Sequence, residues 1–196
     1  MISFFKKQDK PEVKDFIYMS GLAKYQALFE KILSKNTVVL VYYFKDSWAE
    51  CKALFDGAKI EYNELPQAAF ELNKINCISA EHLPAYGGDL SKGYMAFIEH
   101  FPSYKTEAVL LQHLYSSRNI KLLDFYTSLD EPLFILFGGE KIKGLMQKLG
   151  MKENEAVSHS MVSQSLVRAQ QKIDENLRSE IAADNGADWI RLNANR

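Results

Sequence analysis

Glycines and lysines between positions 133 and 150 have the composition of a phosphate-binding loop. The stretch reads LFILFGGEKIKGLMQKLG. A P-loop requires G-x-x-x-x-G-K-[ST], because backbone N–H groups surround the phosphates, the lysine neutralises their charge and the hydroxyl binds Mg²⁺. Gly144 is followed instead by leucine and methionine, and the apolar residues before Gly138 recur at helical rather than strand spacing. We interpret Gly138-Gly139 as a helix end with a left-handed glycine, followed by a second short helix.

The other residues capable of chemistry show no catalytic or metal-binding spacing. Neither cysteine lies within a helical turn of a histidine, and no C-x-x-C pair is present. The carboxylates of Asp130 and Glu131 precede Pro132, an arrangement typical of a helix start. We therefore predict no catalytic residue, no metal site and a reducing compartment. The cysteines and histidines to which this applies are Cys51, Cys77, His82, His100, His113 and His159.

The composition of the chain is that of an ordinary globular protein. Its 196 residues are 47% hydrophobic and 25% charged, with a net charge of −1. This balance gives no electrostatic reason to expect a nucleic-acid partner. No apolar run approaches the roughly 20 residues that span a bilayer, and the first residues do not have the pattern of a signal peptide. We expect no transmembrane segment and a cytoplasmic location.

Strand and helix patterns alternate along the chain. Runs such as TVVLVYYF, which are continuous in apolar β-branched and aromatic residues, are typical of strands buried on both faces. We predict an α/β fold with a mostly parallel sheet flanked by helices. The expected strands are 38–43, 60–65, 75–80, 94–98 and 121–127, and the expected helices include 22–34, 47–57 (capped by Asp46 or Ser47) and 104–115.

A long amphipathic helix is expected from Ser160 to about Ala183. At about 1.5 Å per residue it would be roughly 35 Å long. Its apolar stripe must be covered either by a second protomer or partner, or by the tail folding back. We expect the tail, because Asn185-Gly186 offers a turn and Trp189 an anchor, with Ile190 beside it. The stripe consists of Met161, Leu166, Ala169, Ile173 and Leu177.

Several stretches of the chain resemble the second motor domain of the preprotein translocase ATPase SecA. FGGEKIKGLMQKLGMKENEAVSHSMVSQSLVRAQQKID is similar to the family's F-G-G-D-R-I-K-G-L-M-x-x-L-G-M, an acidic stretch and H-x-M-V-S. FYTSLDEPLFILFGG resembles F-Y-L-S-L-E-D-D-L-M-R-I-F-G-G, and TVVLVYYFKDSWAECKALFDGAKIEYNEL matches more weakly. The resemblance covers about residues 15 to 177. It implies a RecA-like motor domain standing alone, without the partner domain that carries the P-loop.

This resemblance also implies a division of the chain. Residues 1–14 are expected to form an N-terminal extension, and residues 15–150 the RecA-like domain. Residues 151–184 are expected to form the region of the long helix, and residues 185–196 a tail.

The nucleotide-facing segments of the family are altered here. Its loop T-N-M-A-G-R-G-T-D-I corresponds best to EHLPAYGGDL, in which Gly87 and Asp89 are retained but Tyr86 replaces the arginine. Its arginine-finger segment Q-L-R-G-R-S-G-R corresponds to QHLYSSR, in which Arg118 is the one arginine left. An arginine finger stabilises charge on the transferred phosphoryl group. We therefore expect no ATP hydrolysis and no required cofactor.

Gly87, Asp89 and Arg118 are the candidates for a vestigial nucleotide site. Weak nucleotide binding by these three residues is one reading. The other reading is that Gly87 and Asp89 form an ordinary Gly-Gly-Asp turn and that Arg118 lies in a polar loop before a strand.

Two functions follow from the resemblance. The first is a non-catalytic, SecA-like interaction module linked to protein export, whose partner is the export machinery, a preprotein or a second copy of the chain. The alternative is a half-enzyme that completes a nucleotide site in trans on a separate P-loop ATPase. The loss of the arginines favours the first.

Overall fold

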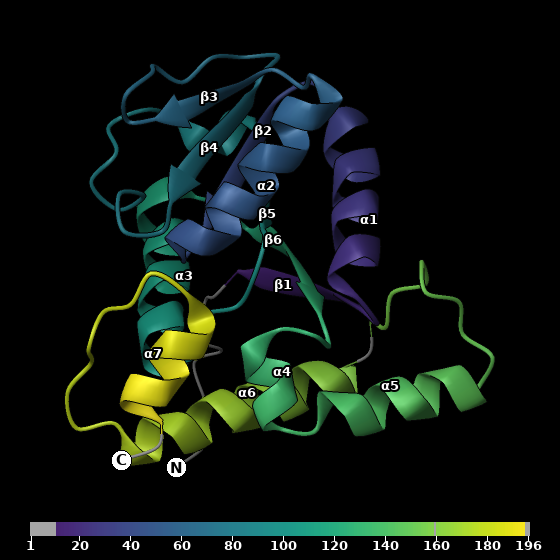
Figure 1. Ribbon diagram of the computed structural model, residues 1–196. Helices are drawn as coiled ribbons and strands as arrows, with labels where there is room; N and C mark the ends of the chain where they lie inside the picture. Colours follow the sequence, from purple (N-terminus) through teal and green to yellow (C-terminus); the bar gives the residue numbers. More distant parts are fainter. Residues whose placement is uncertain (1–10, 159, 195–196) are drawn as a thin grey trace, which may run out of the picture.

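A six-stranded sheet forms the centre of the protein, in the order β1-β6-β5-β2-β4-β3. The computed structural model describes residues 11–158 and 160–194 (Figure 1). All pairs of neighbouring strands are parallel. The arrangement confirms the predicted α/β fold and fits a RecA-like fold. The strands are β1 (Glu12–Tyr18), β2 (Val38–Tyr42), β3 (Tyr62–Leu65), β4 (Ile75–Ser79), β5 (Tyr94–Phe97) and β6 (Leu122–Ser128).

Strand β1 was not predicted from the sequence. It pairs with β6 along its whole length, from Glu12↔Leu122 to Tyr18↔Ser128, and so forms one edge of the sheet. Its first residues lie within the segment expected to precede the domain. At the free edge of β1, the backbone N–H of Ile17 donates to the carbonyl oxygen of Val157 at 3.1 Å, and the N–H of Val157 donates back at 2.9 Å. These two bonds cover part of an otherwise open edge.

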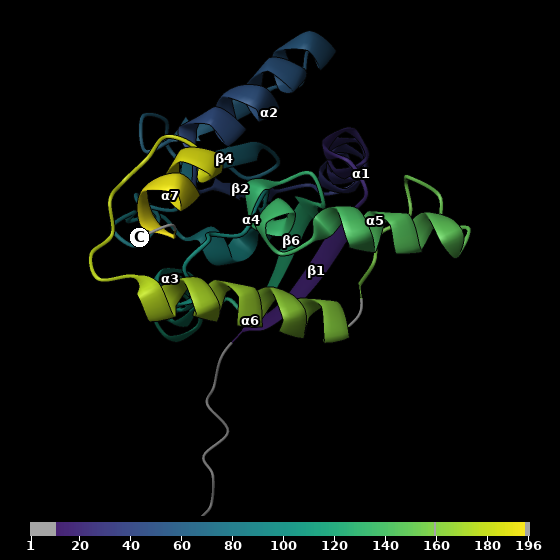
Figure 2. The ribbon, with the colours of Figure 1, turned by 60° about the horizontal axis from the view of Figure 1, so that its bottom comes forward.

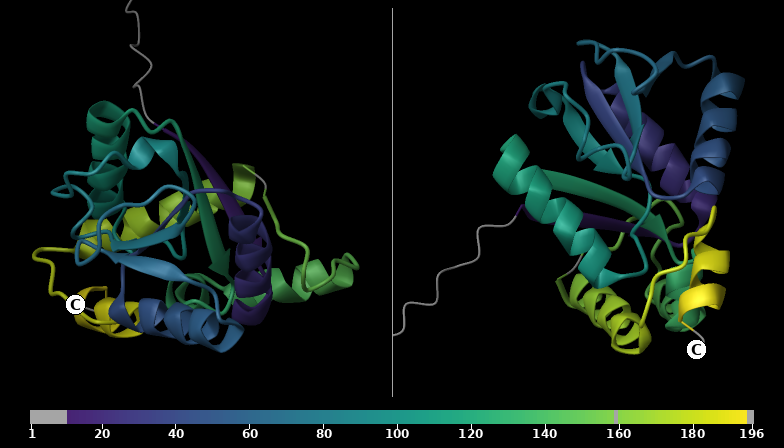
Figure 3. Two further views of the ribbon diagram at one scale, coloured as in Figure 1. Left: turned by 90° about the horizontal axis from the view of Figure 1, so that it is seen from above. Right: turned by 90° about the vertical axis from the view of Figure 1, so that its left-hand side faces the viewer.

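Helices cover both faces of the sheet (Figure 3). Helices α1 (Gly21–Leu33) and α2 (Lys45–Ala58) share a core cluster with Leu40 and Ala96. Helix α3 (Tyr104–Arg118) shares a second cluster with Val41 and Phe97 on the opposite face. Residues 38 to 41 of β2 are fully buried, as the continuous apolar run predicted. A short 3-10 helix, η1 (Leu90–Lys92), precedes β5.

The beginning and end of α2 differ from the prediction. Neither Asp46 nor Ser47 caps the helix; it begins at Lys45 after Phe44, whose side chain makes no cap hydrogen bond. The helix also continues through Gly57 to Ala58, and its C-cap residue Lys59 adopts a left-handed φ of 54°.

The glycines that resemble a phosphate loop separate two short helices, α4 (Pro132–Leu136) and α5 (Gly139–Lys148). Gly138 has a φ of 90°, the left-handed conformation that was predicted there. Gly139 opens α5, and a Cβ atom at this position would lie 2.7 Å from the carbonyl oxygen of Leu129. Both glycines therefore serve the turn between helices. The apolar side chains of α5 are only partly covered, because Leu145 and the C-cap residue Leu149 are exposed.

The long C-terminal helix is shorter than predicted. Helix α6 spans Ser160–Asn176, and a final helix, α7 (Gly186–Asn193), follows after a loop. Figure 2 shows α6 lying across the sheet end beside α3, with α7 folded back near α4. Trp189 is 1% exposed and shares a core cluster with Ile173. The predicted fold-back of the tail is thus confirmed.

Two expected features of α6 fall outside what can be described. His159 lies outside the described residues, and the side chain of Met161 is not described. Among the described residues, no helix is both long and apolar enough to cross a membrane.

Candidate functional site

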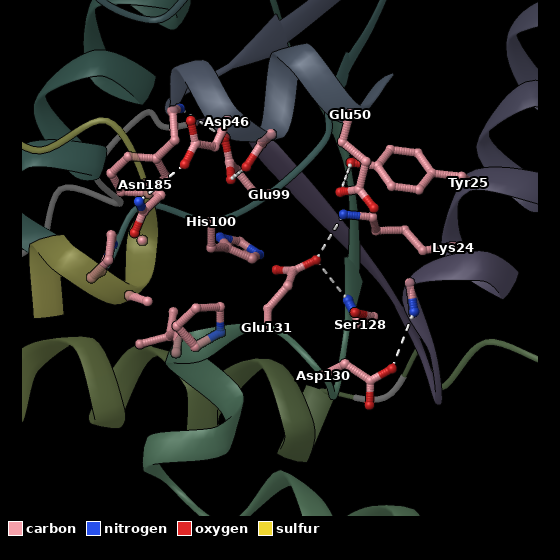
Figure 4. Close-up of a pocket in the computed structure, with 18 residues that line it drawn as sticks. Lys24, Tyr25, Asp46, Glu50, Glu99, His100, Ser128, Asp130, Glu131 and Asn185 are labelled. Carbon is pink, nitrogen blue, oxygen red and sulfur yellow. Dashed lines mark hydrogen bonds and ion pairs between the residues drawn. The ribbon is translucent and has the colours of Figure 1, made fainter. Parts of the chain in front are cut away.

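A cleft of about 510 Å³ lies at the carboxyl ends of β1, β6, β5 and β2 (Figure 4). The chain leaves β2 through α2 toward β3 on one side, and leaves the neighbouring β5 through α3 toward β6 on the other. In open α/β sheets, ligands bind outside the carboxyl ends of the strands at such a switch point. The cleft is therefore the candidate site of this fold.

Carboxylates dominate the walls of the cleft. They come from three separate segments (α2, the end of β5 and the end of β6), which the parallel sheet brings to one edge. Two basic side chains, Lys24 and His100, also line it. The acidic lining residues are Asp46, Glu50, Glu99, Asp130 and Glu131.

Lys24 is held inside the cleft by two acceptors. Its Nζ atom donates to Oε1 of Glu131 at 3.0 Å and to the carbonyl oxygen of Ile98 at 3.1 Å, and the residue is 4% exposed. Burial alone would lower the pKa of Lys24, but the charge and hydrogen bond of Glu131 raise it above its ordinary value. Burial raises the pKa of Glu131, while Lys24 opposes that rise. The lysine is therefore a charged group already paired within the protein.

Glu99 binds the residues that lead into α2. Its Oε1 atom accepts hydrogen bonds from the backbone N–H groups of Tyr43 and Phe44, both at 2.9 Å. The hydroxyl of Ser47 donates to Oε2 of the same carboxylate. Burial raises the pKa of Glu99 to about 7, although the hydrogen bonds from Ser47 and Phe44 oppose the shift. A carboxylate that follows β5 thus lies at the N-terminal end of α2, bound to the two residues before the helix and to a hydroxyl of its first turn.

The side chain of His100, the residue after Glu99, lies between two buried carboxylates. Its Nδ1 atom is 3.0 Å from Oε1 of Glu107 on α3, and its Nε2 atom is 3.1 Å from Oδ1 of Asp15 on β1. Burial alone would lower the pKa of His100, but Glu107 and Asp15 raise it to about 10. Burial would raise the pKa of Asp15, which His100 nevertheless lowers below its usual value. The three side chains form a buried charged network.

The tail completes one wall of the cleft. Asn185 caps α7 by accepting a hydrogen bond from the N–H of Asp188 at 2.8 Å. The Nδ2 atom of Asn185 also donates to Oδ2 of Asp46 at 3.0 Å. On the opposite wall, the hydroxyl of Tyr25 donates to Oε2 of Glu50 at 3.0 Å. The acidic side chains of both walls are therefore fixed by neighbours.

The residues predicted to form a vestigial nucleotide site lie elsewhere, in and around the loop between β4 and β5. Arg118, in the last turn of α3, donates through Nη1 to the carbonyl oxygen of Gly88 at 2.9 Å. Its Nη2 atom donates to the carbonyl oxygens of Tyr86 and Pro84. The structure thus brings Arg118 to the glycine loop, where its guanidinium is bound by carbonyl oxygens.

Asp89 and Gly87 serve the same loop. Oδ1 of Asp89 accepts hydrogen bonds from the N–H and the hydroxyl of Ser91, at 3.2 and 2.6 Å. A Cβ atom on Gly87 would meet nothing within 4 Å, so no close approach requires glycine there. Neither residue lines the cleft, and nor does Arg118.

The sequence patterns did not predict this cleft: Asp130, Glu131 and His100 were considered without being brought to one site, and Lys24 and Glu99 were not singled out. Glu99 and His100 directly follow the buried strand β5, and a charged pair at that place is the signal that points to the carboxyl edge. No comparable pattern marks Lys24, because in the sequence it is one polar position of an amphipathic helix. Glu131 does precede α4, as predicted, but its carboxylate turns toward Lys24 and accepts from the N–H of Ser128.

Comparison with known proteins supports the resemblance over part of the chain. One stretch is homologous to SecA. The chain is 54% identical over 50 residues to the protein translocase subunit SecA of Acidithiobacillus ferrooxidans, which covers 26% of this chain and 6% of that protein. It is 54% identical over 52 residues to SecA of Parabacteroides distasonis, covering 26% and 5% of the two chains. For SecA of Ehrlichia chaffeensis the identity is 47% over 53 residues, covering 27% and 6%.

The SecA homology is thus strong but short. It extends over about a quarter of this chain and a small fraction of each SecA protein. No protein-family model matches the chain.

Proposed function

We propose that this chain is a protein interaction module, derived from the second motor domain of SecA, that works in protein translocation and does not itself hydrolyse ATP. The homologous stretch and the parallel α/β sheet support the origin. The order of the SecA-like segments along the sequence supports the assignment to the second motor domain. The interaction role rests on the chemistry of the cleft.

The observation that carries this proposal is the occupied N-terminus of α2. Phosphate groups bind at helix N-termini because the free N–H groups and the helix dipole attract negative charge. At the N-terminus of α2, the carboxylate of Glu99 accepts the N–H groups of Tyr43 and Phe44, which precede the helix, and the N–H of Asp46 in the first turn donates to the carbonyl oxygen of Asp184 at 3.1 Å. A triphosphate would compete with this carboxylate and meet the other acidic lining residues of the cleft. The carboxyl edge of this sheet is therefore unsuited to ATP.

The surviving arginine gives a second line of support. A working arginine finger must have its guanidinium free to reach a phosphoryl group. The guanidinium of Arg118 instead donates to the carbonyl oxygens of Pro84, Tyr86 and Gly88. Arg118 is thus a structural residue of the loop in this proposal.

A phosphate-release assay on the purified chain tests the absence of hydrolysis. We expect no turnover of ATP or GTP above that of a mock purification, and no saturable binding of a fluorescent ATP analogue. Arg118→Ala should leave both results unchanged, as should Lys121→Ala, an exposed control. Turnover that copurifies with the chain and falls in Arg118→Ala would overturn the proposal.

The translocation role needs a separate measurement. We expect the labelled chain to bind purified SecA or an unfolded preprotein saturably and without ATP. If instead the chain stimulates the ATPase activity of SecA in a stoichiometric manner, the alternative of a half-enzyme acting in trans is favoured. Binding to neither protein would contradict the interaction role.

A further inference from the structure

An apolar groove of about 300 Å³ lies between α6 and the α4–α5 pair, and of the residues that the structure describes, Leu133 alone lines both this groove and the cleft. Its floor contains the buried side chains of Leu133, Phe134, Leu166 and Ala169, and Phe137 stands exposed at its wall. We call this surface the α6 groove.

The size and surroundings of the α6 groove suit a short helix. On α6 it extends from Val162 to Lys172, which corresponds to about 15 Å along a helix axis. Large apolar side chains next to it are unusually exposed, and Figure 2 shows α5 projecting away from the sheet on this side. Exposed apolar surface beside an apolar groove is typical of an interaction site. The neighbouring exposed residues are Ile135, Leu136, Leu145 and Leu149.

The charged residues that line the α6 groove are both basic. Arg168 and Lys172 line it, one helical turn apart, and both are exposed. Neither forms an ion pair with any residue that the structure describes, and no acidic side chain is among the residues lining the groove. Two unpaired cations beside an apolar floor complement a ligand that is apolar on one face and acidic at its edge.

We propose that the α6 groove docks an amphipathic helix of a protein partner. Apolar side chains at i, i+3 or i+4, and i+7 enter the groove, and carboxylates at the edge of that helix pair with Arg168 and Lys172. This inference rests on the proposed interaction role, but it is independent of whether the chain hydrolyses ATP. A chain that turned over ATP could still bind the helix, so the two proposals fail separately.

Three fluorescein-labelled peptides of 14 residues (a length of about 21 Å as helices) test the ligand chemistry. The first carries leucines on one helical face and glutamates at its edges, the second replaces the glutamates with lysines, and the third scrambles the first. We expect saturable binding of the first by fluorescence anisotropy, at least tenfold tighter than that of the other two. Equal binding of all three peptides, or of the acidic and basic peptides, would overturn the proposal.

A double charge reversal tests the place of binding. Arg168→Glu with Lys172→Glu should weaken binding of the acidic peptide at least tenfold and create binding of the basic peptide. Both side chains are exposed, so the fold should survive, which circular dichroism checks. The matched control is Lys35→Glu with Lys121→Glu, a pair of exposed lysines outside the groove.

The control pair should leave the acidic peptide bound as in the wild type. If it weakens binding as much as the groove pair does, the attraction is non-specific and the proposal fails. A concentration-dependent dimer that the groove reversal abolishes, with no peptide binding, would show that a second copy of the chain occupies the groove. That result would also overturn the proposed partner.

Discussion

The Nε2 atom of His100 lies 3.1 Å from Oδ1 of Asp15, although 85 residues separate them in the sequence. Strand β6 runs between β1 and β5, and the imidazole ring crosses it by stacking on Phe125 with ring centroids 4.1 Å apart. On its other side, His100 contacts Glu107 of α3. One side chain therefore ties the edge strand β1 to the centre of the sheet and to a covering helix.

Replacing His100 by glutamine should destabilise the protein strongly. The change leaves Asp15 and Glu107 as buried carboxylates without a cation, which typically costs about 3–5 kcal/mol. Guanidinium unfolding at pH 6 measures the loss. His82→Gln is the matched control, because His82 is exposed, and we expect it to change stability little. Equal effects of the two substitutions would contradict the structural role of the network.

The contribution of His100 to stability should also depend on pH. The pKa of folded His100 is raised from 6.5 to about 10, so its contribution is complete below pH 6.5 and is lost as the pH rises toward 10. The stability difference between wild type and His100→Gln should therefore shrink across this range. A difference that stays constant from pH 6.5 to 10 would show that the imidazole is not charged in the folded protein.

Glu99 should make the protein less stable as the pH rises through a lower range. Its pKa is raised from 4.5 to about 7, so the folded state holds a proton that the unfolded state releases between these values. Stability is then lost as the pH rises from 4.5 to 7, by roughly 3 kcal/mol if the full shift applies. Glu99→Gln keeps an acceptor for the N–H groups of Tyr43 and Phe44, and it should remove this pH dependence. Parallel profiles for the two proteins would disprove the assignment.

Lys24 and Glu131 should show coupling in a double-mutant cycle. Lys24→Met alone leaves Glu131 without its cation and should cost about 3–5 kcal/mol. Adding Glu131→Gln should recover part of this loss, because the remaining groups are neutral, and the coupling should amount to about 1–3 kcal/mol. The exposed ion pair of Lys45 and Asp184 is the control, and no measurable coupling is expected there. Additive effects at Lys24 and Glu131 would contradict a buried pair.

Trp189 should anchor the folded-back tail. Its side chain is 1% exposed and stacks edge-on against Phe101 with centroids 5.2 Å apart. Trp189→Ala should cost about 3–5 kcal/mol, whereas Arg191→Ala, at an exposed position of the same helix, should cost little. Truncation after Ala183 should likewise lower the melting temperature or cause self-association. An unchanged melting temperature and mass after truncation would rule out an anchoring role for the tail.

Local sequence patterns were enough to predict most of the elements. The run TVVLVYYF predicted a strand buried on both faces, and residues 38 to 41 are fully buried in β2. Gly138 marked a helix boundary because its left-handed conformation costs glycine nothing. Asn185-Gly186 and Trp189 predicted the returning tail. Each of these inferences concerns one short segment: whether it is buried, where a helix ends or where the chain turns. Residues close in the sequence largely determine these features.

Strand β1 and the shortened α6 show where local patterns were insufficient. Only part of β1 is apolar, and Asp15 in its middle is buried because His100 neutralises it. Helix α6 ends at Asn176, near the point where Asp174 accepts hydrogen bonds from the hydroxyl of Ser103 and the N–H of Lys105. These contacts join distant parts of the chain, so periodicity within one segment does not reveal them.

The sequence by itself determined the fold class and the absence of a P-loop pattern, while the tertiary structure decided which side chains meet. Lys24 and Glu131 are 107 residues apart and touch because β1 and β6 are neighbours in the sheet, which brings their following loops to one edge. Arg118 was a candidate phosphate ligand in the sequence, and in the fold it binds carbonyl oxygens of the loop before β5. The physical reason is that burial can be read from local spacing, but the partner of a buried charge is set by strand order and chain crossings.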